Sequence, residues 1–152
     1  RNIRSMRLFY EEYANDEKWQ QLVAKLPWGH NLLLIEKIKE GIQEKKGKNI
    51  IIADLTSIED TICKYFVICQ GNSPSQGNSP SQVSAIVDSI KEFTRKGADS
   101  KPYAIDGLRN AEWVAMDYSD VLVHVFLPEV RSFYNLEHLW ADAKLTQIPD
   151  LD

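Results

Sequence analysis

Two aspartates near the end of the chain have a spacing that could support metal chemistry. Asp117 and Asp120 lie three residues apart, and a carboxylate pair of this kind could hold a divalent cation that activates a phosphoryl group. The two residues also bracket the stretch between two apolar runs, where aspartate is favoured because its side chain accepts hydrogen bonds from nearby backbone amides. The sequence therefore predicts a hairpin turn here in preference to a metal site.

His124 lies within an apolar run, on the face opposite Val123 and Val125 if the side chains alternate regularly. A catalytic base would need a nearby nucleophile, and the sequence shows no such residue. We therefore expect a buried structural imidazole or a partly exposed one on a binding face. No metal-ligand spacing joins His124 to His30 or His138, and the sequence predicts neither a bound metal nor a cofactor.

Aromatic and basic residues near the end of the chain are typical of a protein interface. Tryptophan, tyrosine and arginine are the anchors that interfaces favour, and no catalytic constellation accompanies them in this region. The candidate partner-binding residues are Trp113, Asp117, His124, Arg131, Tyr134 and Trp140. Helical spacing also allows a core stripe in the same region, formed by Phe133, Leu136, Leu139 and Trp140. The region predicts a docking surface, with fold and contact roles both open for its aromatic residues.

Length and cysteine content indicate a compact domain in a reducing compartment. A chain of 152 residues with 43% apolar residues can form a core that needs no disulfide, with room for a small appendage. Cys63 and Cys69 lack the spacing of a metal or redox pair, so we expect buried free thiols. No run of eighteen apolar residues occurs. These features predict a soluble, cytoplasmic protein that does not enter a membrane.

Charge is distributed unevenly along the chain. Residues 1–48 carry a net charge of +3 and residues 49–152 carry −7, which gives the overall −4. An acidic domain is repelled by phosphate backbones and attracted to basic protein surfaces, so the larger part favours a protein partner. Direct nucleic-acid contact is expected only through the basic N-terminal part. The alternative is that the acidic side chains serve solubility alone.

Strands and helices are expected to alternate, which predicts an α/β fold. The expected strands cover residues 49–55, 65–70, 103–106, 113–116 and 121–126. The expected helices run from Asn31 as N-cap to Lys46, from Pro80 to about Lys96 and from about Arg131 to Ala143, after two short amphipathic helices in the first thirty residues. Nearly continuous apolar runs at 50–52 and 66–68 are typical of strands covered on both faces.

Four motifs follow one another in the order seen in a known family. They are Asn49-Ile-Ile-Ile-Ala-Asp-Leu55, the run 60–71, Ser79-Pro-Ser-Gln-Val-Ser-Ala-Ile86 and the run from Trp113 to Trp140. Together they resemble the ribosomal silencing factor family, also called Iojap-like proteins, over about residues 38–144. The resemblance implies a mixed β-sheet flanked by helices, related to nucleotidyltransferases, in a domain at residues 32–152.

The same resemblance implies a translation repressor and not an enzyme. Proteins of this family bind the large ribosomal subunit through its protein L-fourteen and sterically prevent the small subunit from joining. The kinship with nucleotidyltransferases leaves a phosphoryl-transfer enzyme open, since a Gly-Ser turn within residues 71–79 could bind phosphate. No Asp-x-Asp follows that turn, which disfavours this alternative. A homodimer also remains open.

The N-terminal residues resemble a different family. Residues 1–39 are similar to the N-terminal helical domain of a family of PD-(D/E)XK nucleases, but no nuclease core follows them. The chain therefore looks composite, with a helical extension at residues 1–31, and a nucleic-acid-binding role of this basic extension is an alternative function. An identical tandem repeat, Gly71–Gln76 followed by Gly77–Gln82, departs from the single copy of the family pattern and is expected to lengthen a polar loop.

Overall fold

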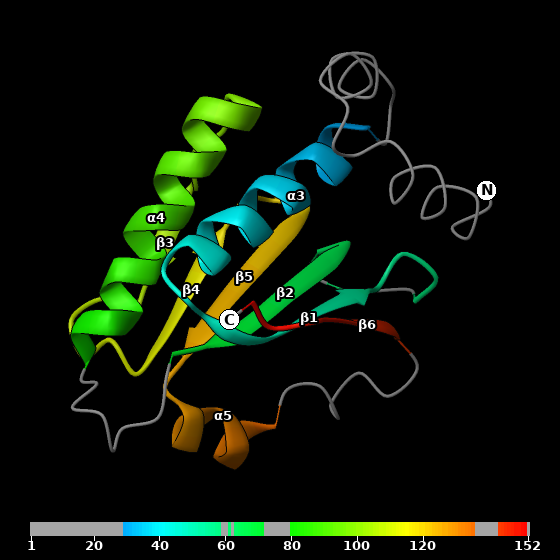
Figure 1. The fold of residues 1–152 in the computed structure, drawn as a ribbon. Helices are drawn as coiled ribbons and strands as arrows, with labels where there is room; N and C mark the ends of the chain where they lie inside the picture. The colour runs from blue at the N-terminus through cyan, green and yellow to red at the C-terminus, as the bar shows by residue number, and fades with distance from the viewer. Residues whose placement is uncertain (1–28, 59–60, 62, 72–79, 136–142, 152) are drawn as a thin grey trace.

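The computed structural model describes residues 29–58, 61, 63–71, 80–135 and 143–151 (Figure 1). Within this part of the chain the helices are α3 (Gly29–Glu44), α4 (Pro80–Ala98) and α5 (Pro128–Tyr134). The strands are β1 (Lys48–Asp54), β2 (Tyr65–Gln70), β3 (Ala104–Asp106), β4 (Trp113–Asp117), β5 (Val121–Phe126) and β6 (Lys144–Ile148). None of the described helices is long and apolar enough to cross a membrane.

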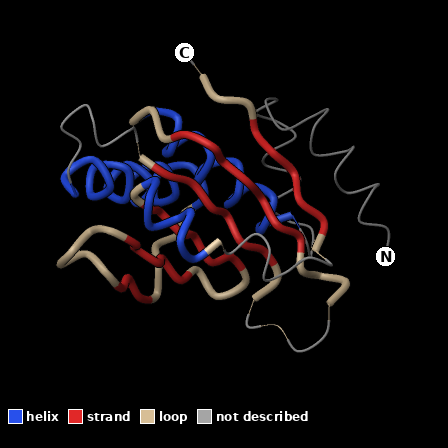
Figure 2. The backbone as a smooth tube through the Cα atoms, turned by 90° about the horizontal axis from the view of Figure 1, so that it is seen from below, coloured by secondary structure: helices blue, strands red, loops and turns tan. Residues whose placement is uncertain are grey.

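One mixed sheet joins these strands in the order β3-β4-β5-β2-β1-β6 (Figure 2). Strand β2 runs parallel to β5, with Tyr65 opposite Val121 and Gln70 opposite Phe126. The other neighbouring strands are antiparallel. The central strands β2 and β5 are buried along almost their whole length, as expected of strands covered on both faces. The expectation of a mixed sheet flanked by helices is confirmed.

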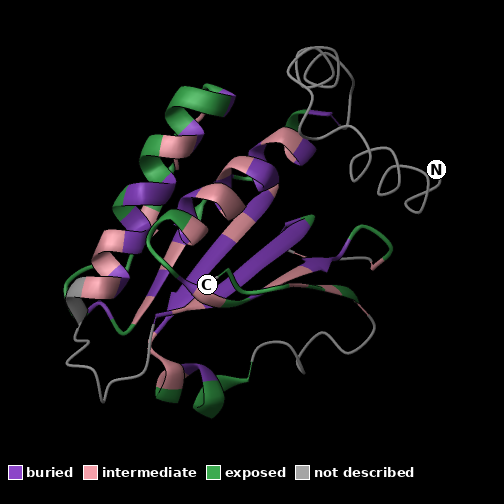
Figure 3. Ribbon diagram, viewed as in Figure 1, coloured by how far each residue is buried: buried purple, intermediate pink, exposed green. Residues whose placement is uncertain are grey.

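Helices α3 and α4 cover one face of the sheet (Figure 1, Figure 3). Their apolar residues pack on the strand residues that point to that side, and Ile38, Ile90 and Val123 are fully buried there. The two helices approach closely at Gly41, where a Cβ atom would lie 2.8 Å from Cα of Ile90. Ser89 Oγ donates a 2.7 Å hydrogen bond to the Gly41 carbonyl at this crossing. The helix layer and the sheet therefore enclose a tightly packed, mainly aliphatic core.

Most element boundaries agree with the expectations from sequence. Strands β2 and β5 match, whereas β1 and β4 differ by one residue and α4 continues two residues beyond Lys96. The expected helix with Asn31 as N-cap begins earlier, at Gly29. That N-cap assignment is wrong because Asn31 lies inside α3, where its Nδ2 donates a 3.2 Å hydrogen bond to Asp120 Oδ2.

The end of the chain departs most from the expectation. The helix expected from about Arg131 to Ala143 begins three residues earlier and is shorter, because Asn135 adopts the left-handed conformation with φ of 51° and terminates it. Strand β6, which is absent from the expected strands, pairs antiparallel with β1. The two helices expected in the first thirty residues, most of the expected loop at the tandem repeat, and Leu136, Leu139 and Trp140 lie outside the described residues.

Candidate docking site

The sheet face opposite α3 and α4 carries a chain of aromatic ring contacts. This aromatic cluster consists of Phe66, Trp113, His124, Phe126, Phe133 and Tyr134. It starts at the buried Phe66 of β2, whose ring centroid lies 4.9 Å from that of His124. The ring of His124 lies 5.9 Å from that of Trp113, and the ring of Trp113 lies 4.7 Å from that of Tyr134. The ring of Tyr134 in turn lies 5.1 Å from that of Phe133. The cluster therefore connects the core to the surface of α5.

Trp113 and His124 are joined by a hydrogen bond as well as by ring contact. Trp113 Nε1 donates to His124 Nδ1 over 3.0 Å. An indole N–H is only a donor, so Nδ1 is the acceptor and the neutral imidazole carries its proton on Nε2. Nε2 is buried without a hydrogen-bond partner among the described residues, and burial lowers the pKa of His124 to about 4. His124 is thus a neutral, buried residue that orients Trp113.

The placement of His124 agrees with the alternation read from the sequence. Val123 and Val125 belong to the core beneath the helices, whereas His124 contacts the rings on the other face. The expectation that His124 lies opposite these valines is confirmed. Only 5% of this residue is exposed, so His124 influences the molecular surface through Trp113, which it orients.

Helix α5 presents the two outermost rings of the aromatic cluster. Pro128 is the first residue of this helix, a position at which a backbone N–H has no partner within the helix. At the other end, the Asn135 N–H donates a 2.8 Å hydrogen bond to the Arg131 carbonyl. Phe133 is 81% exposed and Tyr134 47% exposed. The prediction that Phe133 joins a core stripe is wrong. The helix ends at Tyr134, one residue after Phe133, so no apolar stripe at helical spacing continues from Phe133 along α5. Exposed rings on a buried aromatic support are suitable anchors for a protein partner.

Arg131 lies behind these rings, with only 6% of its surface exposed. Its Nη1 donates to the Asn49 carbonyl over 2.6 Å and to Gln70 Oε1 over 3.2 Å. Asn49 sits at the register shift of β1 with a φ of 51°, and its own N–H donates to Asp150 Oδ1 over 2.8 Å. Hydrogen bonds from a charged donor are stronger than neutral ones. Arg131 therefore fastens α5 to the ends of β1 and β2.

Asp117 lies at the opposite end of β4 from Trp113. Trp113 pairs with Phe126 and Asp117 pairs with Leu122, so about 13 Å of strand separates the two residues. Oδ1 of Asp117 accepts a 2.7 Å hydrogen bond from the Ser119 N–H. The expected turn role of Asp117 is confirmed, and its position separates it from the aromatic cluster.

The structure brings together Trp113, His124, Arg131 and Tyr134 from the predicted partner-binding residues. Trp140 lies outside the described residues. Phe133 belongs with this group, although it is absent from the predicted contacts. A signal for it existed in Asn135, because asparagine is a frequent left-handed residue at helix ends and a helix ending there leaves Phe133 outside any core stripe.

The two thiols fit the expectation from sequence. Cys63 and Cys69 are free and buried. Burial raises the pKa of Cys63 to about 11 and that of Cys69 to about 12, so both thiols stay protonated at neutral pH. Among the described residues, no group of three histidine, cysteine, aspartate or glutamate side chains could hold a metal ion.

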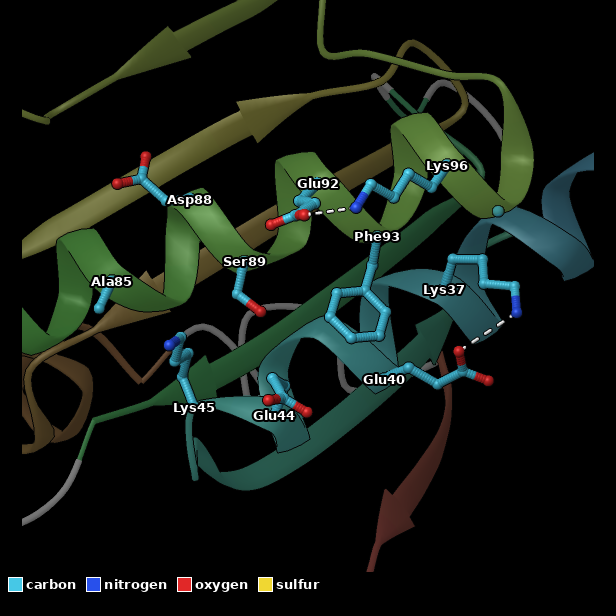
Figure 4. Close-up of a pocket in the computed structure, with 11 residues that line it drawn as sticks. Lys37, Glu40, Glu44, Lys45, Ala85, Asp88, Ser89, Glu92, Phe93 and Lys96 are labelled. Atoms are coloured by element: carbon cyan, nitrogen blue, oxygen red, sulfur yellow. Dashed lines mark hydrogen bonds and ion pairs between the residues drawn. The ribbon is translucent and has the colours of Figure 1, made fainter.

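A groove of about 730 Å³ runs along the outer side of the helix layer, between α3 and α4 (Figure 4). Its charged side chains pair along each helix, Lys37 with Glu40 at 3.2 Å and Lys96 with Glu92 at 2.7 Å. Solvent-accessible pairs of this kind contribute little binding energy. Phe93 is the aromatic residue that lines the groove. The aromatic cluster, with several rings in contact, is the stronger candidate for a docking site.

Comparison with known proteins assigns the fold to a family. Residues 30–152 match the family model described as ribosomal silencing factor during starvation. The chain belongs to the ribosomal silencing factor family. The ribosomal silencing factor RsfS of Bacillus subtilis is 39% identical over 106 residues, which cover 69% of this chain and 82% of that protein. The RsfS of Halalkalibacterium halodurans is 33% identical over 119 residues, which cover 78% of this chain and 94% of that protein.

A solved structure and a plant relative support the same membership. A crystal structure of a protein from Chromobacterium violaceum superposes with a TM-score of 0.63 at 30% identity, covering 71% of this silencing-factor chain and 83% of that chain. The chloroplast protein Iojap of Zea mays is 32% identical over 74 residues, 45% of this chain and 29% of that protein. Residues 1–46 match a second family model, the DUF1016 N-terminal domain, in agreement with a composite chain.

Proposed function

We propose that this chain represses translation by binding the large ribosomal subunit through its protein L-fourteen, where it sterically blocks the small subunit. Membership of the ribosomal silencing factor family supports a ribosomal partner. The aromatic cluster carries the proposal for this molecule, because its outer rings are exposed while its inner rings are fixed in the core. Binding alone produces the effect, so the mechanism requires no covalent step.

Charge around the aromatic cluster favours a basic partner. The acidic residues next to the cluster are Glu112, which precedes Trp113, and Glu129, in the first turn of α5. Both are exposed, whereas the basic Arg131 is buried in the fold. Such an acidic rim increases the rate of encounter with a basic protein surface and repels phosphate backbones.

The test is sedimentation of the full chain with purified large ribosomal subunits at moderate salt. We expect Tyr134→Ala to weaken binding on the order of tenfold, since a well-packed aromatic anchor contributes more than about 1 kcal/mol. Tyr103→Ala is the matched control, because Tyr103 is 80% exposed but lies beside the edge strand β3 and outside the aromatic cluster. Equal binding by both variants would reject the aromatic cluster as the docking site.

Subunit joining is measured separately, by adding small subunits to the same mixture. Excess chain is expected to keep the subunits apart in a sucrose gradient, and Tyr134→Ala is expected to restore joining. Binding without any effect on joining would reject steric occlusion while leaving ribosome binding in place.

The basic N-terminal residues offer a second route to the ribosome, through RNA. They lie outside the described residues, so this alternative depends on the sequence alone. Contacts to phosphates release counterions, and the affinity would then fall steeply with salt. Protein docking is favoured if the affinity depends only weakly on salt and Tyr134→Ala shows the roughly tenfold weaker binding expected above.

A further inference from the structure

The outer end of the aromatic cluster offers ring faces in different orientations. The planes of Phe133 and Tyr134 are inclined by 88°, with centroids 5.1 Å apart. The ring of Trp113 contacts Tyr134, with centroids 4.7 Å apart and an angle of 48° between the ring planes. Ring faces carry the negative part of the aromatic quadrupole and attract cations that come within about 6 Å of the centroid.

Two acidic residues lie near these rings. The Leu127 N–H donates to the Glu112 carbonyl over 2.9 Å, which places Glu112 beside the start of α5. Glu129 lies in the first turn of the same helix, and both glutamates are exposed. Arg131 is buried, and its Nη1 donates to Asn49 and Gln70. Among the described residues, those exposed beside the rings are therefore acidic, and the basic residue of α5, Arg131, is buried.

We propose that the exposed rings of Phe133 and Tyr134, supported from behind by Trp113, receive a cationic side chain of a basic partner protein by cation–π contact. The proposal rests on the docking function given above and specifies the chemistry of its central contact. Arginine is the preferred occupant, because a planar guanidinium stacks on an aromatic face while it donates hydrogen bonds to carboxylates such as Glu112 and Glu129. An RNA base would stack on the same rings, but its phosphates would meet the acidic rim.

Stepwise fluorination of Phe133 tests this contact. Fluorine withdraws electron density from the ring face and weakens cation–π attraction, while the ring keeps its shape and becomes more apolar. Phenylalanine with one, two or three fluorine atoms is incorporated at position 133 of the full chain, and affinity for purified large ribosomal subunits is measured at fixed salt. The matched control carries the trifluorinated residue at position 93, on the helix layer.

We expect affinity to fall with each added fluorine at position 133, by about three- to tenfold over the series. The control at position 93 is expected to bind like the unmodified chain. Unchanged affinity across the series, together with weaker binding of Phe133→Ala, would overturn the cationic occupant and leave an apolar contact. Affinity that rises with fluorination would indicate stacking on an electron-rich RNA base and would also overturn it.

Binding of the unmodified chain shows whether a negative result contradicts the cation–π contact alone or the docking function as well. If the unmodified chain binds and the fluorine series is flat, only the cation–π contact fails. If the unmodified chain does not bind large subunits at all, the docking function and the cation–π contact fail together.

Discussion

The two faces of the sheet are built from different side chains and are covered to different extents. Beneath α3 and α4, aliphatic residues such as Ile38, Ile42 and Ile90 are fully buried, and the two helices touch at Gly41. On the other face, aromatic rings and two buried polar residues, His124 and Arg131, support the short helix α5. Aliphatic packing stabilises the first face, whereas the second face fixes the orientation of particular rings.

The difference suggests which face serves function. Specific hydrogen bonds such as Trp113–His124 and Arg131–Asn49 orient groups that packing alone would leave free to rotate. The same face ends in exposed rings, whereas the helix layer presents charged side chains to its groove. We therefore expect substitutions on the helix-covered face to change stability and substitutions on the aromatic face to change binding as well.

The largest effect on stability is expected on the helix-covered face. Ile38→Ala removes a fully buried side chain and leaves a cavity, so the free energy of unfolding should fall by about 2–5 kcal/mol. Denaturant titration measures this loss, and Leu108→Ala, at a residue 43% exposed, is the control. Large-subunit binding of the folded fraction should stay the same. A loss as small as that of the control would contradict the assignment of Ile38 to the core.

A pH-dependent effect is expected on the aromatic face. The pKa of His124 is about 4 in the folded chain and about 6.5 in an unfolded one, so the unfolded state binds the proton first as pH falls. The free energy of unfolding should therefore fall by about 3 kcal/mol through His124 as pH falls from about 6.5 to about 4. Below that range His124 causes no further loss. Denaturant titrations at pH 7, 5.5 and 4.5 measure this loss.

The variant His124→Gln separates this effect from the titration of carboxylates. Glutamine can still accept the hydrogen bond from Trp113 but cannot bind a proton in this range. We expect the variant to lose less stability than the original chain over the same pH steps. Parallel losses in the two proteins would show that His124 does not titrate between these limits.

A smaller effect is expected at Arg131, where stability and ring position change together. Arg131→Met removes hydrogen bonds to Asn49 and Gln70 and should cost about 1.5–3 kcal/mol. Because these bonds fasten α5, amide hydrogen exchange at Asn135 should become faster and large-subunit affinity should fall, although Arg131 itself is buried. The exposed Arg109→Met is the control. Unchanged exchange at Asn135 would contradict the anchoring role.

Sequence patterns were sufficient for the strands β1 to β5 and for the face of the sheet on which His124 lies. Alternation places Val123 and Val125 under the helices and His124 on the opposite face, because a strand directs successive side chains to opposite sides. Apolar runs likewise gave β2 and β5 their boundaries. These features depend on local sequence, which explains why they could be predicted.

The candidate site depends on contacts between distant parts of the chain, and the sequence did not predict those. Arg131 has the residue type of an interface anchor, but its bonds to Asn49, 82 residues away, remove it from the surface. Asp117 and Trp113 are close in sequence, yet the strand between them separates their side chains. Phe133 is exposed because α5 ends at a single left-handed residue. Each outcome follows from tertiary geometry that residue type and spacing do not contain.

Strand β6 also has a consequence for the order in which the chain folds. It pairs with β1, so the first of the described strands is covered by the last of them. As long as β6 is not paired, Ile50, Ile51 and Ile52 form an uncovered strand edge that can pair with another chain. Contacts between such distant residues also form slowly. A partly folded copy of this protein in which β6 is not paired is therefore the form most prone to aggregate.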